Sequence, residues 1–367
     1  MKIALFLGAG ASVPLGKPVT VDFKEILSHK VDMQSISYWF IHHYGYNDVE
    51  EVLQAIRDTK DFWEGYGCKY LRHIYRLVIK DSSGKEISFE DYINELSKLE
   101  KIIHDEVFNV YRWNLDYDGA LKKIYSKLLD FMKESSEKIM IFTTNYDRAL
   151  EEYCGRINDD YHCDDGFRLY TRTEKFYWDG HGKYEKSPLA KEGATEVFLH
   201  KLHGSLNWKE HKGDVIEIER TSEEGRPNDK NYSDSILIFP TLTTKDRHQL
   251  KPFKSIREEF AQYMKEADVC IVIGFSFRDN HLKEIFTDFI TEGKKFIVIS
   301  PKAKSDYNDN LLVSMAKTSD GRDETIRRGF VRGTTHVSFI ENKLTSENVK
   351  KIIHDIQRII EPEKHLV

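Results

Sequence analysis

The residues of this chain that are best suited to chemistry gather in four short segments, each at or directly after the end of an apolar run. The segments are Gly8–Ser12 (GAGAS), Thr143–Asp147 (TTNYD), Lys201–Ser205 (KLHGS) and Gly274–Asp279 (GFSFRD). Glycine lets a backbone approach a phosphate closely, and an imidazole exchanges protons near neutral pH. Together the segments provide two glycine turns, an amide, a carboxylate and an imidazole.

The first segment indicates a nucleotide site. Gly8 and Gly10 allow a sharp turn after the apolar run, and the small residues Ala9 and Ser12 leave backbone N–H groups uncovered. A helix that begins here would add a field that favours an anion. The G-x-G-x-x-G pattern of dinucleotide sites is incomplete, because Val13 stands at the third glycine position. Tight packing of a strand against a helix therefore stays open as a second interpretation.

Seven apolar runs predict buried strands, and they must position these segments. The runs cover Ile3–Leu7, Ile139–Phe142, Val197–Leu202, Ile236–Phe239, Val269–Ile273, Lys295–Ser300 and Thr335–Ile340. Helical periods such as Leu121–Met132, Phe260–Ala267 and Leu282–Thr291 alternate with them, which predicts an α/β fold with a Rossmann-like, doubly wound parallel sheet. In such a sheet the carboxyl ends of the strands meet at one crevice, so the four segments should lie together.

The rest of the chain carries weaker patterns. Between about residues 21 and 137 helical periods replace strands, as in Val49–Ile56 and Phe89–Leu99, which predicts a large inserted helical layer. The stretches Cys163–Gly193 and Lys212–Asp234 show little periodicity, so loops or short hairpins are expected there.

Composition narrows the classes of partner. The 367 residues carry a formal net charge of −6, so direct binding to nucleic acid is not expected. No apolar run approaches the ~20 residues that span a bilayer, and no leader peptide is recognisable, so we expect a cytoplasmic protein without a membrane partner. The four cysteines form no C-x-x-C pair, and therefore no zinc or other metal is expected.

The four segments, in this order, resemble the sirtuin superfamily, and specifically its bacterial branch of zinc-less, NAD-hydrolysing proteins of antiphage defence. The resemblance implies a single sirtuin-like domain over residues 1–367. Its Rossmann-like NAD-binding core would comprise residues 1–30 and 131–345, with a helical insertion at 31–130. The implied chemistry is cleavage of the bond between nicotinamide and ribose, which needs no strong acid because nicotinamide leaves as a neutral ring.

The resemblance also implies roles for individual residues. Asn145 and His203 would be catalytic: the amide orders the nicotinamide ribose and the attacking water, and the imidazole acts as a base. Asp147 would accept a hydrogen bond from the carboxamide of nicotinamide. The residues expected to bind NAD are Gly8, Ala9, Gly10, Ser12, Thr144, Asn145, Asp147, Gly274 and Ser276.

Other interpretations of these positions stay open. Asn145 or, as the better candidate, Asp147 would instead cap a helix that starts near Arg148, and Asp279 would cap the helix that follows it. His200 is a rival to His203 as the functional imidazole.

The expected function is an NAD+ glycohydrolase that releases nicotinamide and ADP-ribose. Residues 206 to 269 contain no cysteine, so the zinc module of protein-deacylating sirtuins is missing and water is the expected acceptor. Uncontrolled hydrolysis is toxic, which implies an effector held inactive until triggered, by assembly into a homo-oligomer or by a lid over the cleft. The resemblance further implies a HerA-type ATPase as a possible partner. The alternatives are a non-catalytic sensor of NAD or ADP-ribose that gates a partner ATPase, and a protein deacylase or ADP-ribosyltransferase.

Overall fold

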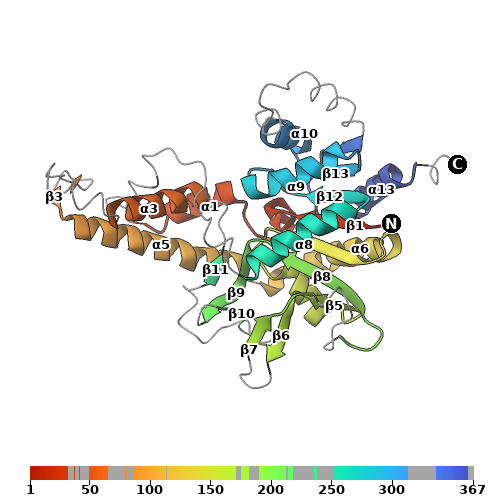
Figure 1. Cartoon of the computed structure of the whole chain (residues 1–367), viewed down its shortest axis with the longest axis horizontal. Helices are drawn as coiled ribbons and strands as arrows, with labels where there is room; N and C mark the ends of the chain where they lie inside the picture. Colours follow the sequence, from red (N-terminus) through yellow and green to blue (C-terminus); the bar gives the residue numbers. More distant parts are fainter. Residues whose placement is uncertain are drawn as a thin grey trace.

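A seven-stranded parallel sheet lies at the centre of the molecule (Figure 1). The computed structural model describes residues 1–31, 37, 41, 49–64, 79–80, 86–112, 114–170, 175–181, 190–211, 214–217, 235–237, 251–312 and 336–362. In spatial order the strands are β14 (Val337–Ile340), β13 (Lys295–Ile299), β12 (Val269–Ile273), β1 (Ile3–Leu7), β4 (Ile139–Thr143), β8 (Thr195–Lys201) and β5 (Tyr161–Asp164). All neighbouring strands in this sheet are parallel.

The order of the strands confirms the predicted Rossmann-like, doubly wound fold. The chain begins in the middle of the sheet with β1, adds β4, β5 and β8 on one side, and then returns to add β12, β13 and β14 on the other. The direction of winding therefore reverses between β1 and β12, which is where such sheets bind ligands. The strands β1, β4 and β12 are buried along their whole length, as expected for strands covered on both faces.

Helices cover both faces of this sheet. The helices α6 (Asp118–Ser135) and α13 (Val349–Ile360) pack on the face that receives Ile3, Leu5 and Leu7 of β1. The helices α8 (Phe253–Glu266) and α9 (Asn280–Thr291) pack on the face that receives Ala4 and Phe6, since successive side chains of a strand point to opposite faces. Shorter segments are α7 (Ala149–Glu152), α10 (Ala303–Asp306) and the π-helical turns Tyr153–Ile157 and Tyr307–Leu312.

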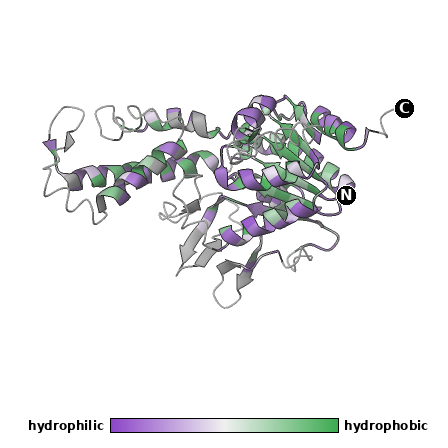
Figure 2. Cartoon of the chain, turned by 45° about the horizontal axis from the view of Figure 1, so that its top comes forward, coloured by the Kyte–Doolittle hydropathy of each residue, from purple (hydrophilic) through white to green (hydrophobic). Residues whose placement is uncertain are grey.

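Three helices project to one side of the sheet and form an arm: α1 (Thr20–Ser28), α3 (Val49–Glu64) and α5 (Phe89–Tyr111) (Figures 1 and 2). They bury an apolar cluster of their own, which Tyr146 from the loop after β4 and Leu206 from strand β9 (Gly204–His211) join. A two-stranded hairpin, β2 (Ile79–Lys80) and β3 (Glu86–Ile87), lies at residues 79–87. The arm contains the predicted inserted helices, whereas α6 starts within the expected insertion but packs on the parallel sheet.

A second sheet is antiparallel, with the strand order β11 (Ser235–Leu237), β9 (Gly204–His211), β10 (Asp214–Glu217), β7 (Lys175–Trp178) and β6 (Phe167–Tyr170). The run Ile236–Phe239 therefore supplies a strand of this sheet through its first two residues, while residues 238–239 lie outside the described part. The stretch Cys163–Gly193 contains the predicted hairpin, as β6 and β7, but also the end of the edge strand β5. Among the described residues no helix is long and apolar enough to cross a bilayer.

Candidate functional site

The four chemical segments all lie at the carboxyl ends of adjacent strands. Gly8–Ser12 follows β1, Thr144–Asp147 follows β4, His203 follows β8 and Gly274–Asp279 follows β12. These four strands are neighbours in the order β12, β1, β4, β8. The fold therefore brings together four segments that are separated by up to about 270 residues in the sequence.

The glycines pack the loops after β1 and β12 against each other. The N–H of Gly10 donates to the carbonyl oxygen of Gly274 at 2.9 Å. A Cβ atom on Gly8 would lie 2.6 Å from that same oxygen, and one on Gly274 would lie 2.4 Å from the backbone nitrogen of Ala11. Gly274 also has a φ of 67°, a left-handed conformation that L side chains rarely adopt. Close approach of two backbones thus requires glycine here.

The turn after β1 differs from the expected anion site in one respect. Only short 3₁₀ turns, Ala9–Ala11 and Val13–Leu15, follow the strand, and the first α-helix begins at Thr20. The N–H groups of Gly8, Gly10, Ala11 and Ser12 donate to backbone carbonyl oxygens. Among the described residues, the N–H of Ala9 is the one in this turn that lacks a protein acceptor.

Ser12, Asn145 and Asp147 form one hydrogen-bonded group that joins the loops after β1 and β4. The amide nitrogen of Asn145 donates to the carbonyl oxygen of Gly8 at 3.0 Å and to the Ser12 hydroxyl at 2.9 Å. The Ser12 hydroxyl in turn donates to Oδ2 of Asp147 at 2.7 Å. With both N–H donors of the amide engaged, Oδ1 of Asn145 is the atom that presents an acceptor to a ligand.

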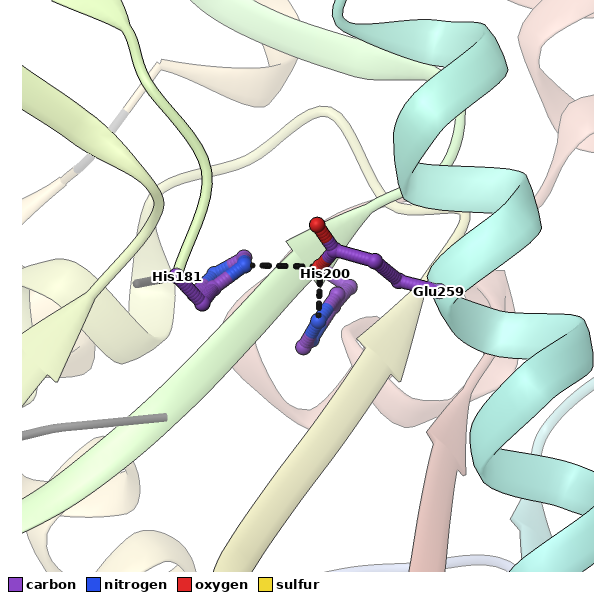
Figure 3. Close-up of side chains that lie close together, drawn as sticks. All are labelled: His181, His200 and Glu259. Atoms are coloured by element: carbon purple, nitrogen blue, oxygen red, sulfur yellow. Dashed lines mark hydrogen bonds and ion pairs between the residues drawn. The ribbon is translucent and has the colours of Figure 1, made fainter. Parts of the chain in front are cut away.

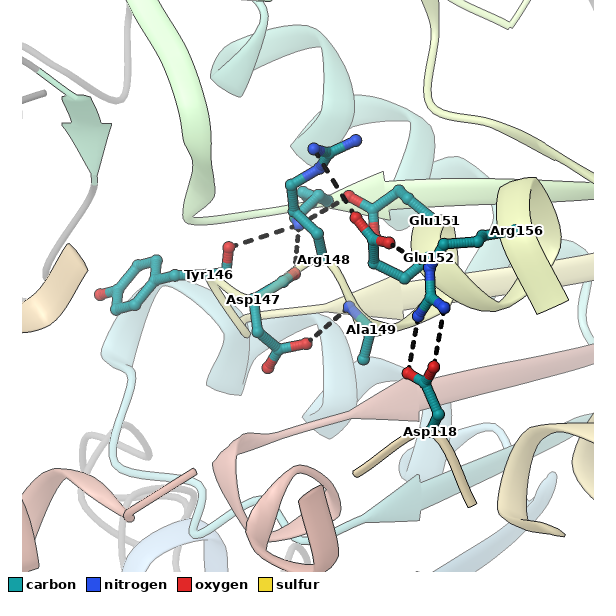
Figure 4. Close-up of polar contacts among 9 residues, drawn as sticks. Asp118, Tyr146, Asp147, Arg148, Ala149, Glu151, Glu152 and Arg156 are labelled. Atoms are coloured by element: carbon teal, nitrogen blue, oxygen red, sulfur yellow. Dashed lines mark hydrogen bonds and ion pairs between the residues drawn. The ribbon is translucent and has the colours of Figure 1, made fainter. Parts of the chain in front are cut away.

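Asp147 also supports the following helix, as the alternative interpretation held. Its Oδ1 accepts a hydrogen bond from the N–H of Ala149 at 3.1 Å, at the start of α7 (Figure 4). Lys201 holds the same loop from the neighbouring strand: its Nζ donates to the carbonyl oxygen of Asp147 and lies 2.9 Å from the Glu151 carboxylate. Lys201 is 1% exposed, so this buried ion pair fixes the position of the loop.

His203 pairs with Asp279 across the sheet edge. Nε2 of His203 lies 2.7 Å from Oδ2 of Asp279, and both residues are buried. Their strands, β8 and β12, are three positions apart, so the pair spans the ends of β4 and β1, a distance of about 14 Å between strand axes. Oδ1 of Asp279 also accepts from the N–H of His281 at 2.8 Å, which caps α9.

The carboxylate determines which nitrogen of His203 is available. Burial would raise the pKa of Asp279, but the hydrogen bond and charge of His203 outweigh burial and lower it, so the carboxyl is ionised at neutral pH. An ionised carboxylate accepts a hydrogen bond from Nε2–H, which leaves the lone pair of a neutral imidazole on Nδ1. The sequence placed Asp279 at the end of the fourth chemical segment and as a possible helix cap, but nothing in its spacing shows that it meets His203.

The remaining predicted residues take the following places. Thr144 and Ser276 are partly exposed; the N–H of Thr144 donates to the carbonyl oxygen of Leu7, and the carbonyl oxygen of Ser276 accepts from Asn310. Next to Ser276, Phe277 is buried with a φ of 56°, a strained conformation for a bulky residue. His200 points to the face covered by α8, where it bonds Glu259, and is therefore not at the carboxyl edge.

Tyr146 links the loop after β4 to the segment after β8. Its ring centroid lies 6.5 Å from that of His203, and its carbonyl oxygen accepts from the N–H of Leu206. The loops after β1, β4, β8 and β12 are thus linked in a ring: β1 to β4 through Asn145, β4 to β8 through Tyr146, β8 to β12 through Asp279, and β12 to β1 through Gly274. The ring of loops is a candidate ligand site at the switch point of this doubly wound α/β sheet.

Comparison with known proteins finds a family match over part of the chain. Residues 139–316 match a protein family described as SIR2-like domain, which covers just under half of the chain. A solved structure of a mutant Sir2 homologue with 2′-O-acetyl ADP-ribose is 12% identical, with 97% of this chain and 92% of that chain covered and a TM-score of 0.41. A Sir2 homologue with NAD is 11% identical, with 97% and 90% covered and a TM-score of 0.42. No curated protein matches the sequence.

Proposed function

We propose that this protein is an NAD+ glycohydrolase, and that the ring of four loops at the carboxyl edge holds its substrate. One observation carries the proposal: Asn145 and the His203–Asp279 pair come from different strands, yet the fold ties all three into the same edge. The match of residues 139–316 to SIR2-like domains supports NAD as the ligand. Without the cysteine pairs of deacylating sirtuins, water is the acceptor that the sequence favours.

The chemistry assigns one task to each polar group. The C1′–N bond breaks with its electron pair moving to the nicotinamide ring, and a water oxygen forms the new bond to C1′. Oδ1 of Asn145 accepts from that water or from a ribose hydroxyl. Nδ1 of His203 takes the proton that the water or hydroxyl loses and later gives it to solvent. Asp279 acts as a positioning residue, because it fixes the ring and its tautomer without touching NAD.

The binding roles follow from the atoms that remain available. Gly8, Gly10 and Gly274 keep two backbones close, and the Ala9 N–H is available to a phosphate oxygen. The carboxylate of Asp147 already accepts from Ser12 and Ala149, and a carboxamide of nicotinamide would share its remaining lone pairs. Thr144 and Ser276, both partly exposed, complete the contacts with the substrate.

The helical arm is placed to control NAD hydrolysis. Tyr146 lies between His203 and the apolar cluster of the arm, where its ring meets that of Tyr111 at 6.1 Å. Movement of the arm would therefore shift the loop that carries Asn145. This connection fits a cytoplasmic effector of antiphage defence that stays inactive in a homo-oligomer, or with a HerA-type ATPase partner, until a trigger moves the arm.

The direct test measures nicotinamide release from NAD by the purified chain, alone and in a lysate that contains its genomic neighbour. The wild type should release nicotinamide under at least one condition, and Asn145→Ala should abolish the release. Asn114→Ala, which removes an exposed amide that caps a short turn, is the matched control and should leave it intact. Binding of NAD without turnover under both conditions would contradict the proposal and favour a sensor, and turnover only with an acyl-peptide would favour a deacylase.

A further inference from the structure

Three side chains converge on the opposite side of β8 from Lys201. His181 follows β7 of the second sheet, His200 lies on β8, and Glu259 lies on α8 (Figure 3). Nδ1 of His181 and Nε2 of His200 each lie 3.0 Å from the same oxygen, Oε2 of Glu259. The side chains of both histidines are at most 1% exposed, whereas that of Glu259 is 27% exposed, so one side of the cluster reaches solvent.

The two ring nitrogens of His181 both face hydrogen-bond acceptors, so either a cation or a second proton is needed between the ring and Glu259. Its Nε2 lies 3.2 Å from the carbonyl oxygen of Leu199, which can only accept, while its Nδ1 faces the carboxylate, which also only accepts when ionised. A neutral imidazole has a single N–H and satisfies only one of them. Either His181 carries two protons, or its Nδ1 lone pair and Oε2 share a positive ion.

The surroundings favour the ion. His200 places its own Nε2 3.0 Å from Oε2 of Glu259, so a second imidazole nitrogen faces the same carboxylate oxygen as His181. The two rings stack with centroids 4.0 Å apart, and a buried imidazolium would lie against this second ring. The Nε2 contact of His181 with a backbone carbonyl is the outer-shell bond that metal-binding histidines usually make.

We propose that His181, His200 and Glu259 bind a divalent ion of the zinc class. Two imidazoles and one carboxylate are a ligand set that zinc uses, with a fourth position left for water on the solvent side of Glu259. Ligands about 2.1 Å from a tetrahedral ion lie about 3.4 Å apart, and the three donor atoms here all lie within 4.8 Å of one another. Modest side-chain shifts therefore accommodate the ion.

The site would act on stability. It ties the segment after β7 and the helix α8 to strand β8, and thus joins the second sheet to the parallel sheet. The proposal departs from the expectation of no metal, which considered cysteine pairs alone. It is independent of the proposed enzymatic function, because none of the three residues belongs to the ring of loops at the carboxyl edge.

The test is metal content and stability of the full chain after removal of any affinity tag. Chain stripped with EDTA and dialysed against Zn²⁺ should retain about one zinc per chain, and zinc should raise the Tm of the stripped protein by several degrees. His181→Ala and Glu259→Gln should lose the bound zinc and its effect on Tm. His162→Gln is the control and should retain both, because His162 on β5 pairs with a different carboxylate, that of Glu196 on β8, at 3.9 Å.

A measurement on the wild type alone tests the proposal even if the variants fail to fold. Co²⁺ added to the stripped chain should give the intense visible absorption of a tetrahedral cobalt site, and Zn²⁺ should displace it. Absence of bound zinc and of that absorption, together with a Tm that neither zinc nor EDTA changes, would overturn the proposal in favour of a doubly protonated His181.

Discussion

Two histidines three residues apart illustrate how differently the same pair of side chains can be used. His200 and His203 each bond a carboxylate, at 3.0 and 2.7 Å, and each is buried. His200 lies within β8 and meets Glu259 from the middle of α8, among aromatic rings. His203 lies beyond the end of β8 and meets Asp279 at the first turn of α9. Position relative to the strand end, and not the residue pair, decides which imidazole can meet a ligand at the carboxyl edge.

The largest expected effect is a loss of activity in His203→Ala, which distinguishes His203 from His200. His203→Ala removes the proposed base and should lower turnover of NAD about 1000-fold, because general base catalysis contributes that much. Its Tm should also fall by several degrees, because the buried carboxylate of Asp279 loses its partner, so turnover is compared per folded molecule. Nicotinamide release and a thermal melt measure both, with the exposed His354→Ala on α13 as control. Turnover that survives the substitution would remove His203 from the mechanism.

A smaller loss of activity should follow from Asp279→Asn. The amide no longer requires a proton on Nε2, so the other tautomer competes and Nδ1 loses its lone pair in part of the molecules. We expect kcat to fall about 100-fold with little change in KM, since Asp279 does not touch NAD. If KM rose by the same factor while kcat stayed unchanged, Asp279 would instead contribute to the binding of NAD.

For His200→Ala we expect a loss of stability without a loss of turnover. This substitution leaves a cavity and removes one partner of a partly exposed carboxylate, which should cost about 2 kcal/mol of unfolding free energy. Turnover per folded molecule should stay within about threefold of the wild type, because the ring lies on the α8 face of the sheet. Urea unfolding and steady-state kinetics provide the two values. A selective loss of turnover with unchanged stability would reverse the assignment of the two histidines.

The smallest expected effect is a dependence of stability on acid. The pKa of Asp279 is lower in the folded chain than the ordinary value of 3.8, so its ionised form stabilises the fold above that value. This contribution is lost as the pH falls from about 4 through the folded pKa. Urea unfolding at a series of pH values should therefore show a steeper acid loss for the wild type than for Asp279→Asn. Identical slopes would show that the pair does not affect stability.

The sequence predicts the central sheet well and its margins poorly. Runs such as Ile3–Leu7 and Val269–Ile273 are continuous and apolar because both faces are covered, and the strands match them residue for residue. The edge strand β5, Tyr161–Asp164, was missed because two of its four residues are polar or charged. In the antiparallel sheet, β6, β7 and β10 lie in stretches where loops or short hairpins were expected, whereas β9 was not predicted, because polar and charged residues interrupt its apolar pattern.

At the candidate site, too, some features could be predicted from the sequence and others could not. Motifs at strand ends identify the loops that meet, because the topology of a parallel sheet decides which ends are adjacent. Partners that depend on loop paths, such as Asp279 for His203 and Lys201 for the Asp147 loop, follow from no spacing in the sequence. The same holds for His181 and Glu259, which are 78 residues apart and belong to different layers.

The most direct measurement counts both products of NAD in a reaction without any acyl-peptide. The purified chain, or the chain in the lysate with its genomic neighbour, should release one nicotinamide and one free ADP-ribose for each NAD consumed, and His203→Ala should release neither. Nicotinamide without free ADP-ribose, or NAD that remains intact under both conditions, would contradict the assignment of the carboxyl edge as a site of NAD hydrolysis.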